Sequence, residues 1–155
     1  MILISHRGNI DRVIRRRENT EDYIQEAIDL GYDVEIDVWF INFKYYLGHD
    51  GPDNEVEIEW LLARRNNLWI HCKNFEALSG LMNTSLKLFY HQKEDYTIIS
   101  DKHIWAHATR FDDKCIIPLI DMESVNSFNF SKKINCYGIC SDFIKQIKVK
   151  INEKN

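Results

Sequence analysis

The chain has 155 residues, of which 45% are hydrophobic and 28% charged, and its formal net charge at pH 7 is −4. This length and composition predict one folded globular domain, residues 1–155, and exclude an intrinsically disordered chain. The acidic balance, with a pI of about 5.9, argues against nucleic acid as the main partner.

The sequence predicts neither a membrane span nor a secretion signal. No apolar run approaches the roughly 20 residues that cross a bilayer, and residues 1–7 carry no basic leader. We therefore expect a cytoplasmic protein without a transmembrane segment. The cysteines form no C-x-x-C pair and are expected to be buried thiols; they are Cys72, Cys115, Cys136 and Cys140.

The first predicted strand ends in a charged segment. Residues 1–5 form a continuous apolar run, typical of a strand buried on both faces, and His6-Arg7-Gly8 follows directly. The next helix is predicted to have Asn19 as its N-cap and to end at Gly31, where a left-handed residue would stop it. The charged segment therefore lies at the carboxyl end of the first strand.

The second predicted strand carries two carboxylates on one face. It covers residues 32–40, and its side-chain period of two puts Glu35 and Asp37 together, opposite the apolar residues. Two neighbouring carboxylates repel each other unless a cation or a proton lies between them. A short extended piece, residues 44–47, then leads to the turn Gly48-His49-Asp50-Gly51-Pro52.

A third unit repeats this alternation. A helix is predicted from Asp53 or Asn54 to about Arg65, and a strand over residues 68–73 places His71 and Lys73 on one face. A helix capped by Asn74 follows and ends near Met82. Strands that alternate with helices are typical of βαβ units and a parallel sheet.

Beyond Thr84, predicted strands follow one another too closely for full helices between them. These strands cover residues 86–91, 96–100, 103–107 and 115–120. A last strand over residues 135–141 precedes a helix that opens at Asp142. Several helices of an alternating fold are therefore expected to be missing from this half of the chain.

Four short motifs place titratable groups at strand or helix edges. In chain order they are His6-Arg7-Gly8, Glu18-Asn19-Thr20, Glu35-Ile36-Asp37-Val38 and Gly48-His49-Asp50. This ordered set resembles the glycerophosphodiester phosphodiesterase family, within the phospholipase-C-like phosphodiesterases. Two more segments are similar to family segments: Ile70-His71-Cys72-Lys73 and Gly138-Ile139-Cys140-Ser141-Asp142.

The resemblance implies a (β/α) barrel of the TIM type. Because the chain is shorter than the roughly 200 residues at which such barrels begin, we expect a compact, trimmed α/β barrel that lacks several outer helices. The active site of such a barrel lies at the carboxyl ends of its strands, where the four motifs are expected to meet.

The resemblance also implies a role for each charged group. The implied roles are metal binding for Glu35 and Asp37, acid and base catalysis for His6 and His49, and phosphate contact for Arg7 and Lys73. Fixed cations stabilise the extra negative charge of a phosphoryl transition state, and histidine transfers protons near neutral pH. Family chemistry implies attack by a neighbouring hydroxyl of the substrate, which gives a cyclic phosphate that water later opens.

The identity of the metal stays open because His71 stands where the family has a metal-binding glutamate. Carboxylate and water ligands favour Mg²⁺ or Ca²⁺, whereas an imidazole ligand would suit Mn²⁺ or Zn²⁺. His71 could bind the ion directly, bridge to it through water, or only touch the substrate.

Three further residues are candidates for the edge of the site. His91 either points into the mouth of the barrel, where it would contact substrate, or makes a local hydrogen bond at a strand end. Glu18 is interpreted as a carboxylate that supports Arg7, and Asp142 as one that supports a metal ligand from behind.

These observations predict a metal-dependent phosphodiester hydrolase that acts on a glycerophosphodiester or a similar small phosphate diester, with two histidines as acid and base. The alternative is a catalytically inactive phosphate- or anion-binding module on the same fold. Strands without covering helices would expose apolar surface, which a homodimer could bury.

Overall fold

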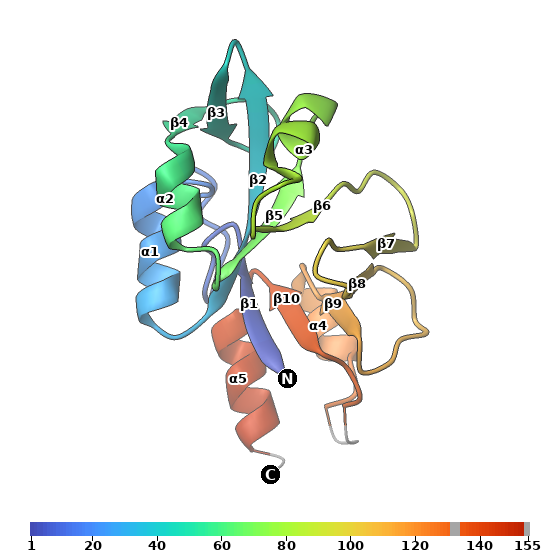
Figure 1. Ribbon diagram of the computed structural model, residues 1–155. Coiled ribbons are helices and arrows are strands. Elements are labelled where there is room, and N and C mark those ends of the chain that lie inside the picture. The colour runs from blue at the N-terminus through green and yellow to red at the C-terminus, as the bar shows by residue number, and fades with distance from the viewer. Residues whose placement is uncertain (131–133, 154–155) are drawn as a thin grey trace.

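Ten strands form one mixed, curled sheet, and five helices lie against it (Figure 1). The computed structural model describes residues 1–130 and 134–153, and these counts refer to them. The strands are β1 (Ile2–His6), β2 (Asp33–Ile41), β3 (Lys44–Leu47), β4 (Asn54–Val56), β5 (Leu68–Cys72), β6 (Lys87–Phe89), β7 (Tyr96–Ile98), β8 (Ile104–Ala106), β9 (Cys115–Pro118) and β10 (Gly138–Ser141). The helices are α1 (Glu21–Asp29), α2 (Ile58–Ala63), α3 (Phe75–Leu81), α4 (Met122–Ser127) and α5 (Ile144–Asn152). None of these helices is long and apolar enough to cross a membrane.

The sheet has a parallel centre with antiparallel additions. Its parallel strands are ordered β6-β5-β2-β1-β10-β9-β8. The antiparallel strands β3 and β4 continue from the far half of β2, and β7 pairs antiparallel with β8. All seven parallel strands therefore end at the same edge of the sheet, which is where the motif residues gather.

The expected trimmed (β/α) barrel is wrong. Helices alternate with strands only in parts of the chain: β2, β3 and β4 are joined as hairpins, and among the described residues no helix lies between β6 and β9. Residues 90–114 must supply β7, β8 and their turns, which leaves no room for helical crossovers of a dozen or more residues. Since β4, β6 and β7 each pair on one side only, the sheet is a curled half-barrel with open edges.

Two predicted helix starts are also wrong. Thr20, and not Asn19, is the N-cap of α1, because the Asn19 side chain turns inward and donates to Asp37 instead. The helix predicted from residue 53 or 54 begins only at Ile58, because residues 54–56 pair with β3 as strand β4. In both places a long-range contact outweighs the local helix signal.

Two other helix starts follow local capping. Asn74 caps α3 as predicted, because its side chain accepts a hydrogen bond from the Ala77 backbone amide at 3.1 Å. The sequence analysis missed α4, a short helix between β9 and β10. Its N-cap is Asp121, which accepts from the Ser124 amide at 2.7 Å.

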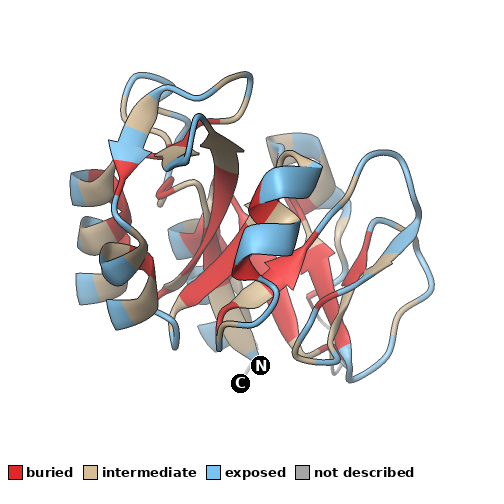
Figure 2. Ribbon diagram, turned by 45° about the horizontal axis from the view of Figure 1, so that its top comes forward, coloured by how far each residue is buried: buried red, intermediate tan, exposed pale blue. Residues whose placement is uncertain are grey.

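The apolar core occupies both faces of the curled sheet (Figure 2). On the outer face, the helices α1, α2 and α3 pack on β2 and β5, and α4 and α5 pack on β9 and β10. The inner cluster comes mainly from strands and contains Ile4, Trp69, Phe89, Ile99, Trp105, Ile116 and Cys140. All four cysteines are buried and free, which confirms the predicted buried thiols. Burial raises the pKa of the Cys72 thiol to about 12, so it stays protonated at neutral pH.

Candidate active site

The inner face of the sheet changes from apolar to charged along each strand. Ile4 of β1, Trp69 of β5 and Cys140 of β10 belong to the inner apolar cluster. Two residues after each of these positions in the sequence come His6, His71 and Asp142. Because residues two apart on a strand share a face, one apolar layer lies beneath one layer of titratable groups.

Register brings the charged groups of different strands together. On the parallel pair β1 and β2, His6 is opposite Glu35, and on β2 and β5, Asp37 is opposite His71. The predicted alternation of β2 is confirmed: Glu35 and Asp37 share the inner face, and Val34, Ile36 and Val38 belong to the core beneath the helices.

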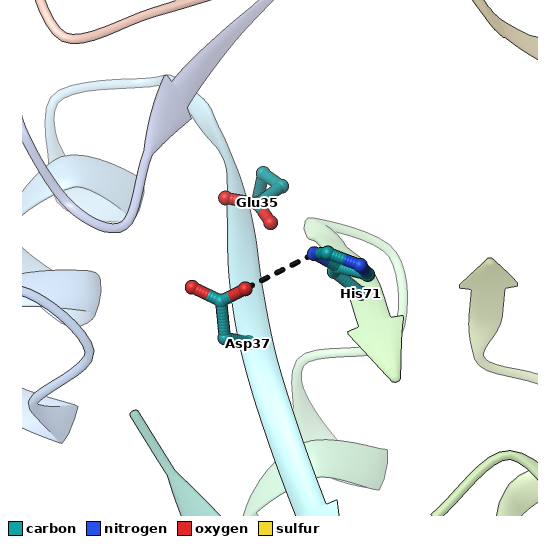
Figure 3. Close-up of side chains that lie close together, drawn as sticks. All are labelled: Glu35, Asp37 and His71. Carbon is teal, nitrogen blue, oxygen red and sulfur yellow. Dashed lines mark ion pairs between the residues drawn. The ribbon is translucent and has the colours of Figure 1, made fainter. Parts of the chain in front are cut away.

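Glu35, Asp37 and His71 converge on one point (Figure 3). Each offers one ligand atom, and the three atoms lie within 4.8 Å of one another. Glu35 is 3% exposed and Asp37 is fully buried. Glu35 Oε2 and Asp37 Oδ1 have no hydrogen-bond partner among the described residues. Two neighbouring buried carboxylate oxygens that accept no well-aligned hydrogen bond are an arrangement that a bound cation would stabilise.

A hydrogen bond on the far side of the His71 ring orients the ring toward this point. Its Nε2 lies 2.9 Å from the backbone carbonyl of His91, which can only accept, so Nε2 carries a proton. Its Nδ1 lies 3.1 Å from Asp37 Oδ1. With the Nε2 proton fixed in this way, Nδ1 is the ring nitrogen that would be available to a metal ion beside the two carboxylates. Metal-binding histidines are commonly fixed in this way, with the other nitrogen donating to a carbonyl. The residues present thus fit a divalent ion.

The surrounding charges separate the pKa values of the two carboxylates. Burial and the neighbouring charge of Asp37 raise the pKa of Glu35. Burial would also raise the pKa of Asp37, but the positive charges of Arg7 and Lys73 are among the effects that outweigh burial and lower that pKa. Asp37 is therefore the carboxylate that stays ionised at neutral pH.

His6 is held by a buried polar network. Its Nδ1 lies 2.8 Å from Asp142 Oδ1, and its Nε2 lies 3.7 Å from Glu35 Oε2. The side chain of Asn9, which is fully buried, donates to Asp142 at 2.8 Å and to Glu18 at 2.8 Å. Burial would lower the pKa of His6, but the hydrogen bond to Asp142 and the charge of Glu35 outweigh it and raise that pKa. Asp142 thus supports His6, and among the described contacts it does not support a predicted metal ligand.

Two cations and His49 also contact the Asp37 carboxylate. Arg7 Nε lies 3.0 Å from Asp37 Oδ2, although its angle is not that of a hydrogen bond, and Lys73 Nζ lies 3.3 Å from Asp37 Oδ1. Arg7 Nη2 lies 2.7 Å from His49 Nδ1. Because a guanidinium can only donate, His49 Nδ1 accepts and its proton is on Nε2. Glu18 supports Arg7 at 3.3 Å, as predicted from the sequence.

A cavity of about 210 Å³ joins these groups to an aromatic wall. The charged side of the cavity is formed by His6, Arg7, Glu35, His49 and His71, and the other side by Phe89, His91, Trp105, His107, Pro118 and Ile120. His91 stacks on His107 with ring centroids 4.4 Å apart, and its Nδ1 lies 3.1 Å from Thr97 Oγ1. His91 therefore lines the cavity and makes the predicted local hydrogen bond, and its contact with a substrate stays a prediction.

The backbone that presents His49 is tight. Gly48 has φ 152°, and a Cβ atom there would lie 2.0 Å from the backbone oxygen of Gly51. We expect Gly48→Ala to lower the free energy of unfolding by about 2 kcal/mol or more, because the turn must open to admit the methyl group. Chemical denaturation measures this, with Gly31→Ala as a control that shares a positive φ but meets no neighbouring atom. Equal losses for the two variants would contradict the steric cause.

The structure brings together all the predicted site residues, including His49 and Lys73 from outside the parallel strands. The sequence analysis missed two asparagines. Asn9 lies directly after the His6-Arg7-Gly8 motif, and Asn19 was interpreted as a helix cap. Asn19 in fact holds Asp37 twice, because its Nδ2 donates to Oδ2 and its Oδ1 accepts from the Asp37 amide, both at 3.0 Å. The only sequence signal for these asparagines was their position inside a charged motif, for Asn19, or directly after one, for Asn9.

Comparison with protein-family models, with curated proteins and with solved structures found no match for this chain. The resemblance to glycerophosphodiester phosphodiesterases therefore rests on the motifs alone. Any function assigned to the site has to be argued from its geometry.

Proposed function

We propose that this protein is a metal-dependent phosphodiester hydrolase, related through its site to the glycerophosphodiester phosphodiesterases. The observation that carries the proposal is the convergence of two buried carboxylates, Glu35 and Asp37, with His71: their three ligand atoms lie within 4.8 Å of one another, and Glu35 Oε2 and Asp37 Oδ1 accept no well-aligned hydrogen bond among the described residues. Four groups that suit phosphodiester chemistry surround this pair: His6, Arg7, His49 and Lys73.

The two histidines have complementary protonation in this geometry. With His6 Nδ1 donating to Asp142, a neutral His6 has its lone pair on Nε2, where it can accept the proton of the attacking oxygen. His49 accepts from Arg7 at Nδ1 and so directs its Nε2–H toward the leaving oxygen, where this hydrogen bond stabilises the developing negative charge while the leaving alcohol takes up its proton from solvent. In the reaction, the new P–O bond forms as the P–O bond to the leaving alcohol breaks.

The cations of the site stabilise charge on the phosphoryl oxygens. Arg7 and Lys73 are mostly buried and fixed by Asp37, so they need little reorganisation when negative charge develops. A divalent ion held by Glu35, Asp37 and His71 would supply Lewis-acid polarisation of a phosphoryl oxygen. Carboxylate ligands favour Mg²⁺ or Ca²⁺, and the imidazole favours Mn²⁺ or Zn²⁺.

We expect the purified chain to hydrolyse bis(p-nitrophenyl) phosphate, and we expect EDTA to abolish this activity. Readdition of single metals should restore it and identify the preferred ion, because charge stabilisation by the metal is worth several kcal/mol. The release of p-nitrophenol measures the rate. Hydrolysis at the same rate in EDTA would contradict the metal dependence.

A second candidate is a phosphate-binding module without turnover. It is favoured by the saturation of Asp37, which Arg7, Lys73, His49 and His71 all contact, so that a metal would have competitors. This candidate predicts that calorimetry detects binding of inorganic phosphate to the metal-free chain while no diester is hydrolysed with any metal. Hydrolysis would exclude it.

A further inference from the structure

The hairpin of β2 and β3 is unusually aromatic. Five of the eight residues 39–46 are aromatic, in the order Trp39, Phe40, Phe43, Tyr45 and Tyr46. The pairs Val38 with Cys72 and Val38 with Leu47 show that the hairpin continues where β5 ends. It therefore projects roughly 15 Å past the edge of the parallel strands, and Figure 1 shows it as the outermost feature at that end.

Phe43 occupies the tip of this hairpin at a cost to the fold. Ile41 pairs with Lys44, so the loop is Asn42-Phe43, with φ values of 50° and 64°. Two-residue loops with positive φ at both positions favour glycine at the second. Phe43 is nevertheless there, 95% exposed. Neither the backbone nor the packing of this chain accounts for a phenylalanine at this position.

A second exposed phenylalanine lies beside the hairpin. Asn74 bonds both the amide and the carbonyl of Phe40, which fixes the start of α3 against the hairpin. The next residue, Phe75, is 72% exposed. A hollow of about 400 Å³ at the same edge is lined by His49, Lys73 and Tyr90, among others. Tyr90, which is 39% exposed, therefore lines this hollow, and Phe43 and Phe75 lie at the same end of the sheet, after the carboxyl end of β5.

The charge at the tip is balanced. Lys44 Nζ lies 2.7 Å from Glu55 Oε1, and the hairpin segment from Trp39 to Phe43 carries no charge. Exposed Glu57 and Glu76 nearby would repel an anionic surface. An aromatic, electrically neutral projection suits the interface of a zwitterionic lipid layer, where tryptophan and tyrosine concentrate.

We propose that the Trp39–Tyr46 hairpin, with Phe75, docks the protein on a neutral lipid surface and so presents a lipid phosphodiester to the site. The lipid as substrate rests on the proposed function, whereas the docking rests on the hairpin. Two separate phenylalanine side chains supply far less area than the roughly 800 Å² that each partner buries in a stable protein interface. Single side chains that project from a tip can instead enter a fluid lipid layer.

Flotation with phosphatidylcholine vesicles tests the docking. We expect the full chain to float with the vesicles and Phe43→Ser to lower its partition coefficient roughly tenfold. Ile98→Ser is the matched control. Ile98 is 78% exposed, but it pairs with Ile104, the first residue of β8, and so lies at the edge of the sheet opposite to the hairpin. Its partition should equal that of wild type. Adding phosphatidylglycerol should not strengthen binding.

Phe43→Gly separates docking from folding. It removes the side chain and relieves the positive φ, so the melting temperature should rise by roughly 2–4 °C while flotation falls as far as in Phe43→Ser. Loss of binding from a more stable chain supports docking by Phe43 and cannot come from unfolding.

Three outcomes would overturn the docking surface. They are absence of flotation, equal flotation of wild type and Phe43→Ser, and a dimer in light scattering that Phe43→Ser dissociates. A chain that cleaves soluble diester without floating loses the docking proposal alone. A chain that floats through Phe43 and cleaves no diester supports docking and removes the proposed function.

Discussion

His6→Ala should lower the rate of hydrolysis of a soluble phosphodiester by roughly 10²–10⁴-fold, which is the usual contribution of a positioned acid or base. The reason is the geometry of the ring. Asp142 holds Nδ1 at 2.8 Å, so Nε2 is left facing Glu35 and the cavity. The other side chain that Asp142 holds is the amide of Asn9, which cannot act as a base. The rate is measured at saturating metal with bis(p-nitrophenyl) phosphate.

A matched control separates the loss of the base from the loss of the fold. His103 lies at the amino end of β8, away from the site, where it contacts Asp101 and Tyr137. His103→Ala should keep the wild-type rate, and near-ultraviolet circular dichroism should show both variants folded. If folded His6→Ala kept more than about a tenth of the activity, the assignment of His6 as the base would be excluded.

Asp37→Ala should lower the free energy of unfolding by about 3–5 kcal/mol, the usual cost of removing one partner from a buried ion pair. Asp37 is fully buried and is the common partner of Arg7 and Lys73. Its removal leaves both cations facing each other and removes the acceptor of the Asn19 Nδ2 amide, while the backbone amide of residue 37 still donates to Asn19 Oδ1. Urea denaturation measures the loss, because the midpoint shifts with little change of slope.

The contrast with other positions makes this prediction specific. Asp113 is exposed in the turn before β9, and Asp113→Ala should lower the free energy of unfolding by less than about 0.5 kcal/mol. Asp37→Asn should fall between the two, because it keeps the shape and loses the charge. A stable Asp37→Ala chain would show that Glu18 and Glu35 suffice to balance the two cations.

Much of the candidate site could be predicted because its residues follow a local rule. A strand alternates its side chains, so Glu35 and Asp37 had to share a face, and so did His71 and Lys73. The motifs at strand ends then had to meet wherever those strands are parallel. Asn9 and Asn19 could not be found in this way, because their partners lie 133 and 18 residues away along the chain.

The barrel could not be predicted because it depends on what joins the strands. The first 75 residues do contain strand and helix alternation around β1, α1 and β2. Later, β7 takes an antiparallel place beside β8, and the sheet opens instead of closing. The resemblance rests on short motifs in the site. It gives little information about the segments that join the strands, because those segments contain none of the motif residues.

The sequence by itself determined the strand faces, the helix cap at Asn74 and the set of charged residues at the strand ends, because neighbouring backbone geometry decides these features. Only the tertiary structure decided the half-barrel, the pairing of β4, and the direction of the Asn19 and His71 side chains. Those features depend on contacts between segments that are distant in the sequence. The free energy of such contacts exceeds local conformational preference, and a local sequence pattern does not contain it.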